Sequence, residues 1–97
     1  MAMSVEKISE ALSECETILV DYGMWPLELS EKRLNMDEHP HSVSLCHCLY
    51  MCQKAQDFLK EDRREKAMRW LCFVQGVLWT QGLLTIETAK EQNKADG

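Results

Sequence analysis

The sequence predicts an all-α protein. We expect a small bundle of three main helices, with an antiparallel hairpin between the second and third helices and a short C-terminal helix. The chain has 97 residues, which suits a single helical domain over 1–97. It holds only four glycines and two prolines, too few for the many turns of an all-β fold. Apolar residues recur three and four positions apart over long stretches, which is the period of an α-helix.

The first helix is predicted over about 4–22. Ser4 suits the N-cap, and Gly23 stands where helices commonly end. Acidic and hydroxyl side chains fall on the face opposite the apolar one. The apolar face consists of Val5, Ile8, Ala11, Leu12, Cys15, Ile18, Leu19 and Tyr22.

Residues 23–39 interrupt this pattern and are expected to be irregular. Pro26 disfavours helical backbone at the residue before it. Residues 27–34 can also form a short helical turn. We expect Trp25, Leu27 and Leu34 to anchor the segment on the core.

The second and third helices are predicted over about 40–60 and 63–81. Pro40 suits a first helical turn, because the N–H group that it lacks would be unpaired there anyway. A short polar turn joins the two helices, so they should form an antiparallel hairpin. Gly76 lies inside the third helix and has two interpretations: another backbone approaches closely, or an exposed strip tolerates the glycine.

A short last helix is predicted over about 86–94. Gly82 ends the helix before it, and Thr85 can cap the new one. Glu87 in the first turn would interact favourably with the helix dipole.

The second and third helices carry more apolar surface than one stripe each. The central stripe of the third helix consists of Ala67, Trp70, Leu71, Val74 and Leu78, and apolar residues flank it on both sides. Only Arg69, Gly76 and Thr80 remain as a thin strip. A bundle of this size cannot hide so much surface internally, so we expect a homodimer formed through these two helices. The residues expected at the interface are Tyr50, Met51, Phe58, Trp70, Phe73, Val77 and Trp79.

The stretch CHCLYMC, residues 46–52, raises the question of a metal or thiol site. On a helix only Cys48 and Cys52 share a face, whereas a structural zinc site needs ligands that converge. Free cysteines pack as small apolar side chains, and that interpretation is favoured, with no cofactor expected. Cys15 and Cys72 are likewise expected in the apolar surroundings of their own helices. The metal alternative rests on Cys48, Cys52 and His47. A variant of it is a site shared across a dimer through His39, His41 or Cys46.

The remaining signals narrow the class of protein. No phosphate-binding glycine loop, no hydrolase triad signature and no HExxH motif is present, so we expect no enzyme. The net charge of −5 does not favour nucleic-acid binding, and acids interleave with the only basic cluster, Lys60 to Arg69. The sequence contains no run of 18 apolar residues, so no membrane span is predicted. An N-terminus without a signal-peptide pattern and an odd number of cysteines, five, favour a cytoplasmic protein with free thiols.

The run EKAMRWLCFVQGVLWTQGLLTIETAKEQN, residues 65–93, resembles the C-terminal half of small uncharacterised helical proteins encoded by phages and prophages. The resemblance covers about the C-terminal half of the chain. It implies a bacterial host cytoplasm but carries over no functional residue.

The sequence thus predicts a small, non-enzymatic, homodimeric helical protein that acts by protein–protein interaction, as a phage accessory or host-interaction factor. Its partners would be a second copy and another protein. Two alternatives stay open: a metal-binding or thiol-sensing module using Cys48 and Cys52, and an acidic mimic of nucleic acid through the first helix.

Overall fold

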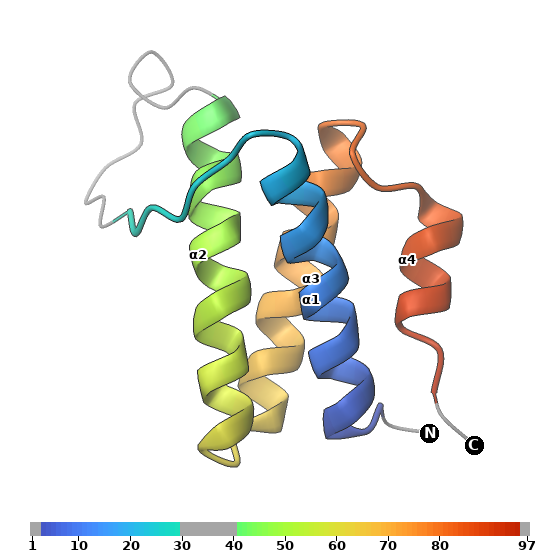
Figure 1. Cartoon of the computed structure of the whole chain (residues 1–97). Coiled ribbons are helices and arrows are strands. Elements are labelled where there is room, and N and C mark those ends of the chain that lie inside the picture. Colours follow the sequence, from blue (N-terminus) through green and yellow to red (C-terminus); the bar gives the residue numbers. More distant parts are fainter. Residues whose placement is uncertain (1–2, 30–40, 96–97) are drawn as a thin grey trace.

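The computed structural model describes residues 3–29 and 41–95, and it shows the all-α fold that the sequence predicts (Figure 1). Four helices follow one another in this part of the chain, which contains no strand. They are α1 (Val5–Asp21), α2 (His41–Lys60), α3 (Arg64–Thr80) and α4 (Ile86–Gln92). The predicted helix limits agree with these bounds to within two residues.

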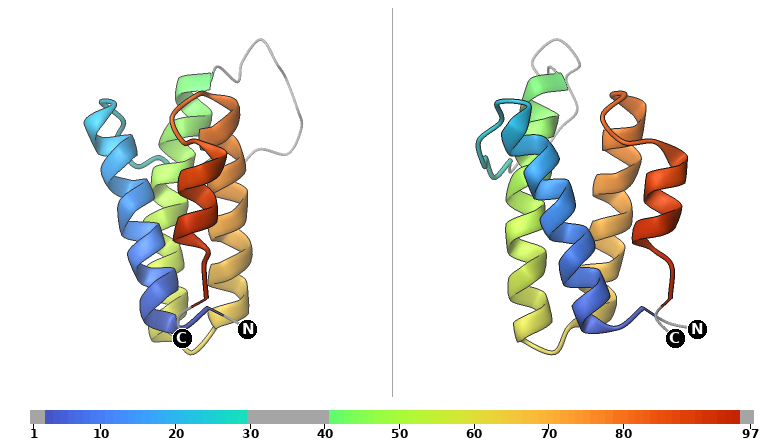
Figure 2. Two further views of the ribbon diagram at one scale, coloured as in Figure 1. Left: turned by 90° about the vertical axis from the view of Figure 1, so that its right-hand side faces the viewer. Right: turned by 45° about the vertical axis from the view of Figure 1, so that its right-hand side comes forward.

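The first three helices form the bundle, and α4 lies against its side. Helix α2 packs along both α3 and α1, and α1 also contacts α3. Successive helices run in opposite directions, so α2 and α3 form the predicted antiparallel hairpin (Figure 2). Helix α4 returns alongside α1, which brings its end close to the start of α1.

Side chains of α1, α2 and α3 fill one continuous core. The largest fully buried side chains come from all three helices: Ile8, Leu12, Leu19, Leu49, Leu71, Val74 and Leu78. All of them lie on the apolar faces that helical periodicity assigns. Burial of such side chains is the main stabilising contribution, about 1.5–3 kcal/mol for each one.

Short polar contacts set the helix ends. The Ser4 hydroxyl accepts a hydrogen bond from the Lys7 N–H at 3.1 Å, and the Thr85 hydroxyl accepts one from the Thr88 N–H at 3.0 Å. Both predicted N-caps are therefore confirmed. Asp62 turns the chain between α2 and α3 with a φ of 61°, a conformation that aspartate tolerates better than most residues. The Arg63 N–H then donates to the Phe58 carbonyl at 2.8 Å.

The segment 24–29 is irregular, as predicted, but it attaches differently from expectation. The Trp25 side chain is 62% exposed, and Leu27 is exposed as well, so neither anchors the segment on the core. Leu34 lies outside the described residues. The segment is held instead by the Met24 side chain, which packs against the core, and by its backbone, since the Leu27 N–H donates to the Cys46 carbonyl of α2 at 3.1 Å.

No helix in the described ranges combines the length and the apolar character needed to cross a membrane.

Candidate functional site

Four of the five cysteines are buried, and Cys72 is exposed. Cys15 projects into the core from α1, and Cys48 and Cys52 project into it from α2. The prediction that these thiols pack as small apolar side chains is therefore confirmed for the three. It was wrong for Cys72, which we expected in apolar surroundings but which lies on the outer face of α3.

The buried thiols are held in their protonated form. Burial, the nearby carboxylate of Glu14 and the neighbouring Cys48 raise the pKa of Cys15 to about 12. Burial raises the pKa of Cys48 to about 11. Burial, together with Cys15 and Cys48, also raises the pKa of Cys52. The thiolate is the form that binds metals and attacks electrophiles, so these three cysteines are poorly suited to either task.

Cys46 is buried for a reason that helical spacing does not reveal. It points away from Cys48, yet segment 24–29 covers it, and its Sγ lies 3.8 Å from the Met24 sulfur. His47 also attaches this segment to α2, because its Nδ1 accepts a hydrogen bond from the Leu29 N–H at 3.1 Å. The imidazole also stacks on Tyr50, with the ring centroids 5.7 Å apart.

A metal centre at CHCLYMC is not assembled by this arrangement. Within residues 3–29 and 41–95, no three histidine, cysteine or acidic side chains are grouped in a way that could hold a metal ion. His47 points to segment 24–29 rather than to Cys48 or Cys52. His39 lies outside the described residues, and so does the side chain of His41.

The predicted interface residues fall into two groups. Phe58 and Met51 are buried within the single chain, at 3% and 7% exposure, and Tyr50, Trp70 and Val77 are packed against the core. These five therefore offer little free surface. Phe73 and Trp79 are 57% and 53% exposed and remain available to a partner.

Part of the extra apolar surface of α2 is buried within the chain at Phe58. Its ring meets Trp70 edge to face, with centroids 4.7 Å apart. Charged groups of Lys66 and Arg63 lie over the same ring, 4.6 Å and 4.9 Å from its centroid. Such aromatic and cation–π contacts cover the ring at the hairpin end of the bundle.

The basic cluster between α2 and α3 is largely engaged within the chain. Arg64 donates to the Met3 carbonyl at 2.7 Å, and Arg63 lies 3.6 Å from the Glu61 carboxylate. With Lys66 and Arg63 also over Phe58, this cluster shapes the fold rather than presenting a row of free cations to phosphates.

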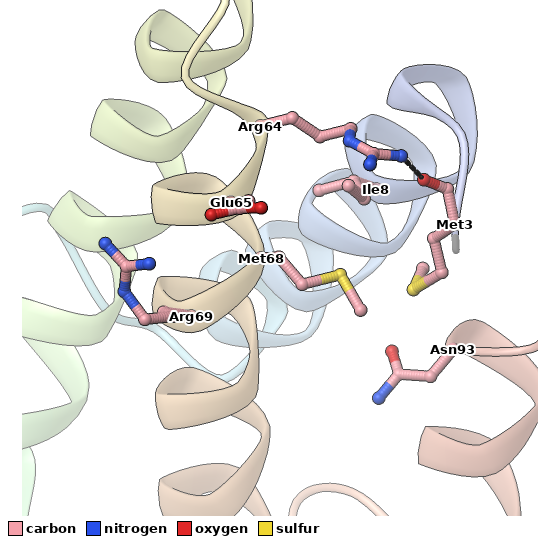
Figure 3. A pocket seen from close by; sticks show the side chains of 7 residues that line it. All are labelled: Met3, Ile8, Arg64, Glu65, Met68, Arg69 and Asn93. Carbon is pink, nitrogen blue, oxygen red and sulfur yellow. Dashed lines mark hydrogen bonds between the residues drawn. The ribbon is translucent and has the colours of Figure 1, made fainter. Parts of the chain in front are cut away.

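An open pocket of about 430 Å³ lies between the starts of α1 and α3 and the end of α4 (Figure 3). Met3, Ile8 and Met68 give it an apolar wall, whereas the Arg69 guanidinium points away from them. Two of the polar groups that line it already have partners, since Arg64 bonds to Met3 and Asn93 bonds to Gln75. The pocket could admit a small apolar group, but its side chains do not form a nucleophile–base pair.

A buried amide network attaches α4 to the bundle. Gln75 of α3 donates to the Gln92 Oε1 at 3.0 Å and to the Asn93 Oδ1 at 2.8 Å, and it accepts a hydrogen bond from the Asn93 side chain at 2.8 Å. The Cys15 thiol points to the Gln92 Oε1 at 3.8 Å. Sequence reasoning missed this network; the signal available was a glutamine on the inner side of α3.

The outer face of α3 is the surface that best fits a binding role. It is exposed along its length and carries two large aromatic side chains. Its members are Glu65, Arg69, Cys72, Phe73, Gly76, Trp79 and Thr80, and we refer to this set as the outer α3 face. Trp79 and Phe73 each expose more than half of their surface and lie on the same helix face, whereas the similarly exposed Tyr22 and Trp25 lie at the end of α1 and in the segment after it.

Comparison with protein-family models, with curated proteins and with solved structures gives no match for the chain.

Proposed function

We propose that this protein is a small, non-enzymatic, homodimeric helical protein that acts by binding another protein. The observation that carries the proposal is the pair of exposed aromatic side chains, Phe73 and Trp79, on the outer α3 face. Aromatic residues are enriched at the energetic centres of protein interfaces, and their exposure to water is unfavourable in a lone chain.

The chemistry of the thiols supports a binding role over a catalytic one. Burial raises the pKa of Cys15, Cys48 and Cys52, which keeps these groups protonated and unreactive. The buried amides of Gln75, Gln92 and Asn93 bond to one another. These polar groups therefore bond within the fold. The two aromatic side chains of the outer α3 face are left as an exposed apolar surface for a partner, in addition to Val20, Tyr22 and Trp25 near the end of α1.

The homodimer is tested by sedimentation velocity over a concentration series of the reduced protein. A double variant, Phe73→Ser with Trp79→Ser, should be monomeric where the wild type is dimeric. Its unfolding free energy should stay close to the wild-type value, because both side chains are already exposed. The matched control is Val20→Ser with Tyr22→Ser, which removes exposed apolar groups from α1 and its end and should leave the dimer intact. A strictly monomeric wild type would remove the proposal's main support.

The setting we propose is a bacterial cytoplasm, with the protein as a phage accessory or host-interaction factor. The support is the resemblance of residues 65–93 to phage and prophage proteins. The test is to recover the tagged protein from bacterial cells and then to rebuild any complex from the two purified components. If no copurifying protein binds again in purified form, this part of the proposal fails.

A second candidate is a metal-binding or thiol-sensing module that uses Cys48 and Cys52. The observation in its favour is that Cys15, Cys48 and Cys52 all face the same core. Because no three suitable side chains are grouped within the described residues, the missing ligand would have to come from a partner. It predicts bound zinc in a native mass spectrum and loss of stability with a chelator. A metal-free protein whose unfolding a chelator does not change would exclude this candidate.

A further inference from the structure

The geometry of the outer α3 face is arranged about Gly76. At about 100° per residue, Phe73 and Trp79 project about 60° to either side of Gly76. One lies about 4.5 Å before the glycine along the helix, and the other lies about 4.5 Å after it. The face thus has a low centre with one exposed aromatic group on each flank.

Nothing inside the chain requires glycine at this position. A Cβ atom at Gly76 would meet no atom of the described residues within 4 Å, so none of residues 3–29 and 41–95 approaches it closely. Its backbone also needs no special conformation, since the glycines with positive φ are Gly23 and Gly82. What glycine provides here is room on the outside of α3, where a second backbone could come close.

We infer that a second copy of this chain occupies the outer α3 face, with the two α3 helices antiparallel and a two-fold axis passing beside Gly76. This inference rests on the proposed homodimer and specifies its geometry. A two-fold interface uses the same surface on both copies, so every contact occurs twice. In the antiparallel arrangement, Phe73 of one copy lies at the same height along the helix axes as the partner's Trp79. Two aromatic pairs then flank a close contact between the two glycines.

The distribution of charge along α3 favours the antiparallel direction. On the outer α3 face, the first half of the helix carries Glu65 and Arg69, because Arg64 and Lys66 contact Met3 and Phe58 within the chain. Its last turn has no basic residue to offset the negative end of the helix dipole. Antiparallel helices place Arg69 toward the C-terminal end of the partner's α3. Parallel helices would place Arg69 beside the partner's Arg69 and Glu65 beside the partner's Glu65, and like charges facing each other across an interface are unfavourable.

The size of the face predicts a weak dimer. A helix of 17 residues is about 25 Å long, and the face is one helix, or about 10 Å, wide. This is less than the roughly 800 Å² that each partner buries in a standard interface. We therefore expect reversible dimerisation that depends on protein concentration.

The native Cys72 allows the geometry to be tested by crosslinking. Cys72 is four residues before Gly76, and Thr80 is four residues after it. In the antiparallel dimer, Cys72 therefore lies at the same height along the helix axes as the partner's Thr80. The variant Thr80→Cys should therefore form disulfide-linked dimers under mild oxidation, with Cys72 bonded to the partner's residue 80. Peptide mapping identifies the bonded pair. Cys72 of the two copies lie about 12 Å apart along the helix axes, so the wild type should not crosslink.

The matched control is Ser13→Cys, which places a new thiol on the exposed face of α1. It should not crosslink under the same conditions. Crosslinking of the wild type through Cys72 alone would indicate parallel helices and overturn the inference. A dimer in sedimentation without crosslinking of Thr80→Cys would also overturn the geometry but leave the proposed function standing. A protein that is monomeric at all concentrations would contradict both.

A second variant tests the close approach itself. Gly76→Leu should raise the dissociation constant of the dimer roughly tenfold or more, because the new side chains would hold the helices apart. It should not lower the melting temperature of the dilute monomer, since the space around Gly76 is open. An unchanged dissociation constant would show that the helices do not meet at Gly76.

Discussion

Each cysteine's environment depends on what packs across from it. Cys48 and Cys52 share a helix face at a spacing of four residues, and that face meets the core. Cys46 points elsewhere but is covered by segment 24–29, where Met24 lies against it. Cys72 has no such cover and is exposed on α3. Helical periodicity predicted the first pair, whereas the other two depended on where a distant segment lies.

Thiol accessibility should separate Cys72 from the other four cysteines. In the folded, reduced protein, one thiol of the five should react rapidly with an aromatic disulfide reagent, and the rest should react only after unfolding. The reaction is followed by absorbance. Cys72→Ser should remove the rapid phase entirely. Rapid reaction of two or more thiols in the wild type would contradict the burial of α1 and α2 cysteines.

Stability should fall at alkaline pH because of the buried thiols. The pKa of Cys15 and that of Cys48 rise from an ordinary value of 9.0 to about 12 and about 11 on folding. Their stabilising contribution is complete below pH 9 and is lost as the pH rises toward these values, because the unfolded chain ionises first. The expected slope is about 1 kcal/mol per pH unit for each thiol. Guanidinium unfolding at several pH values from 8 to 11, under reducing conditions, measures it.

The control for this pH effect is Cys48→Ala. This variant is less stable overall because it loses buried volume, but its stability should depend less steeply on pH above 9. A slope identical to that of the wild type would mean that Cys48 ionises equally in both states.

The sequence predicted the buried inner face of helix α3 but not the full extent of its exposed outer face. Leu71, Val74 and Leu78 lie on the predicted stripe and are buried. The prediction placed Arg69, Gly76 and Thr80 on a thin exposed strip. The structure widens that strip to include Phe73 and Trp79, because neither α2 nor α4 reaches far enough around α3 to cover them.

Gly76→Ala should stabilise the dilute monomer. Alanine favours a helix interior by up to about 1 kcal/mol over glycine, and no atom obstructs its Cβ atom. Thermal or guanidinium unfolding at a concentration below dimerisation measures this gain. The matched control is Gly23→Ala, which should destabilise the protein because φ is +91° there. A loss of stability in Gly76→Ala would indicate that the helix needs glycine for a reason internal to the chain.

The molecule as a whole is a three-helix bundle to which a short fourth helix is attached. Helix α4 has 7 residues, too few to be stable alone. It depends on its packing against α1 and on the amide network around Gln75. That network joins residues 17 and 18 positions apart in the sequence, across the interior of the protein.

Gln75→Leu should loosen α4 more than the rest of the bundle. Leucine keeps much of the side-chain volume but removes three hydrogen bonds and leaves buried amides without partners, at a cost of roughly 1–3 kcal/mol. Hydrogen exchange should accelerate first in α4 and only slightly in the α2–α3 hairpin. The control Gln53→Leu changes an exposed glutamine of α2 and should alter neither. Equal acceleration throughout the molecule would mean that α4 unfolds only with the whole bundle.

The sequence by itself determined the helices, their caps, the hairpin and most of the core. These features follow from local periodicity, from capping residues such as Ser4 and Thr85, and from short connections, all of which act between near neighbours in the chain. Only the tertiary structure decided which apolar surface remains free. Tyr50, Met51 and Phe58 of α2 are covered within the chain, whereas Phe73 and Trp79 of α3 are not. The physical reason is that other segments can pack against a helix from any side. Which of its faces are covered depends on where segments that are distant in the sequence come to lie.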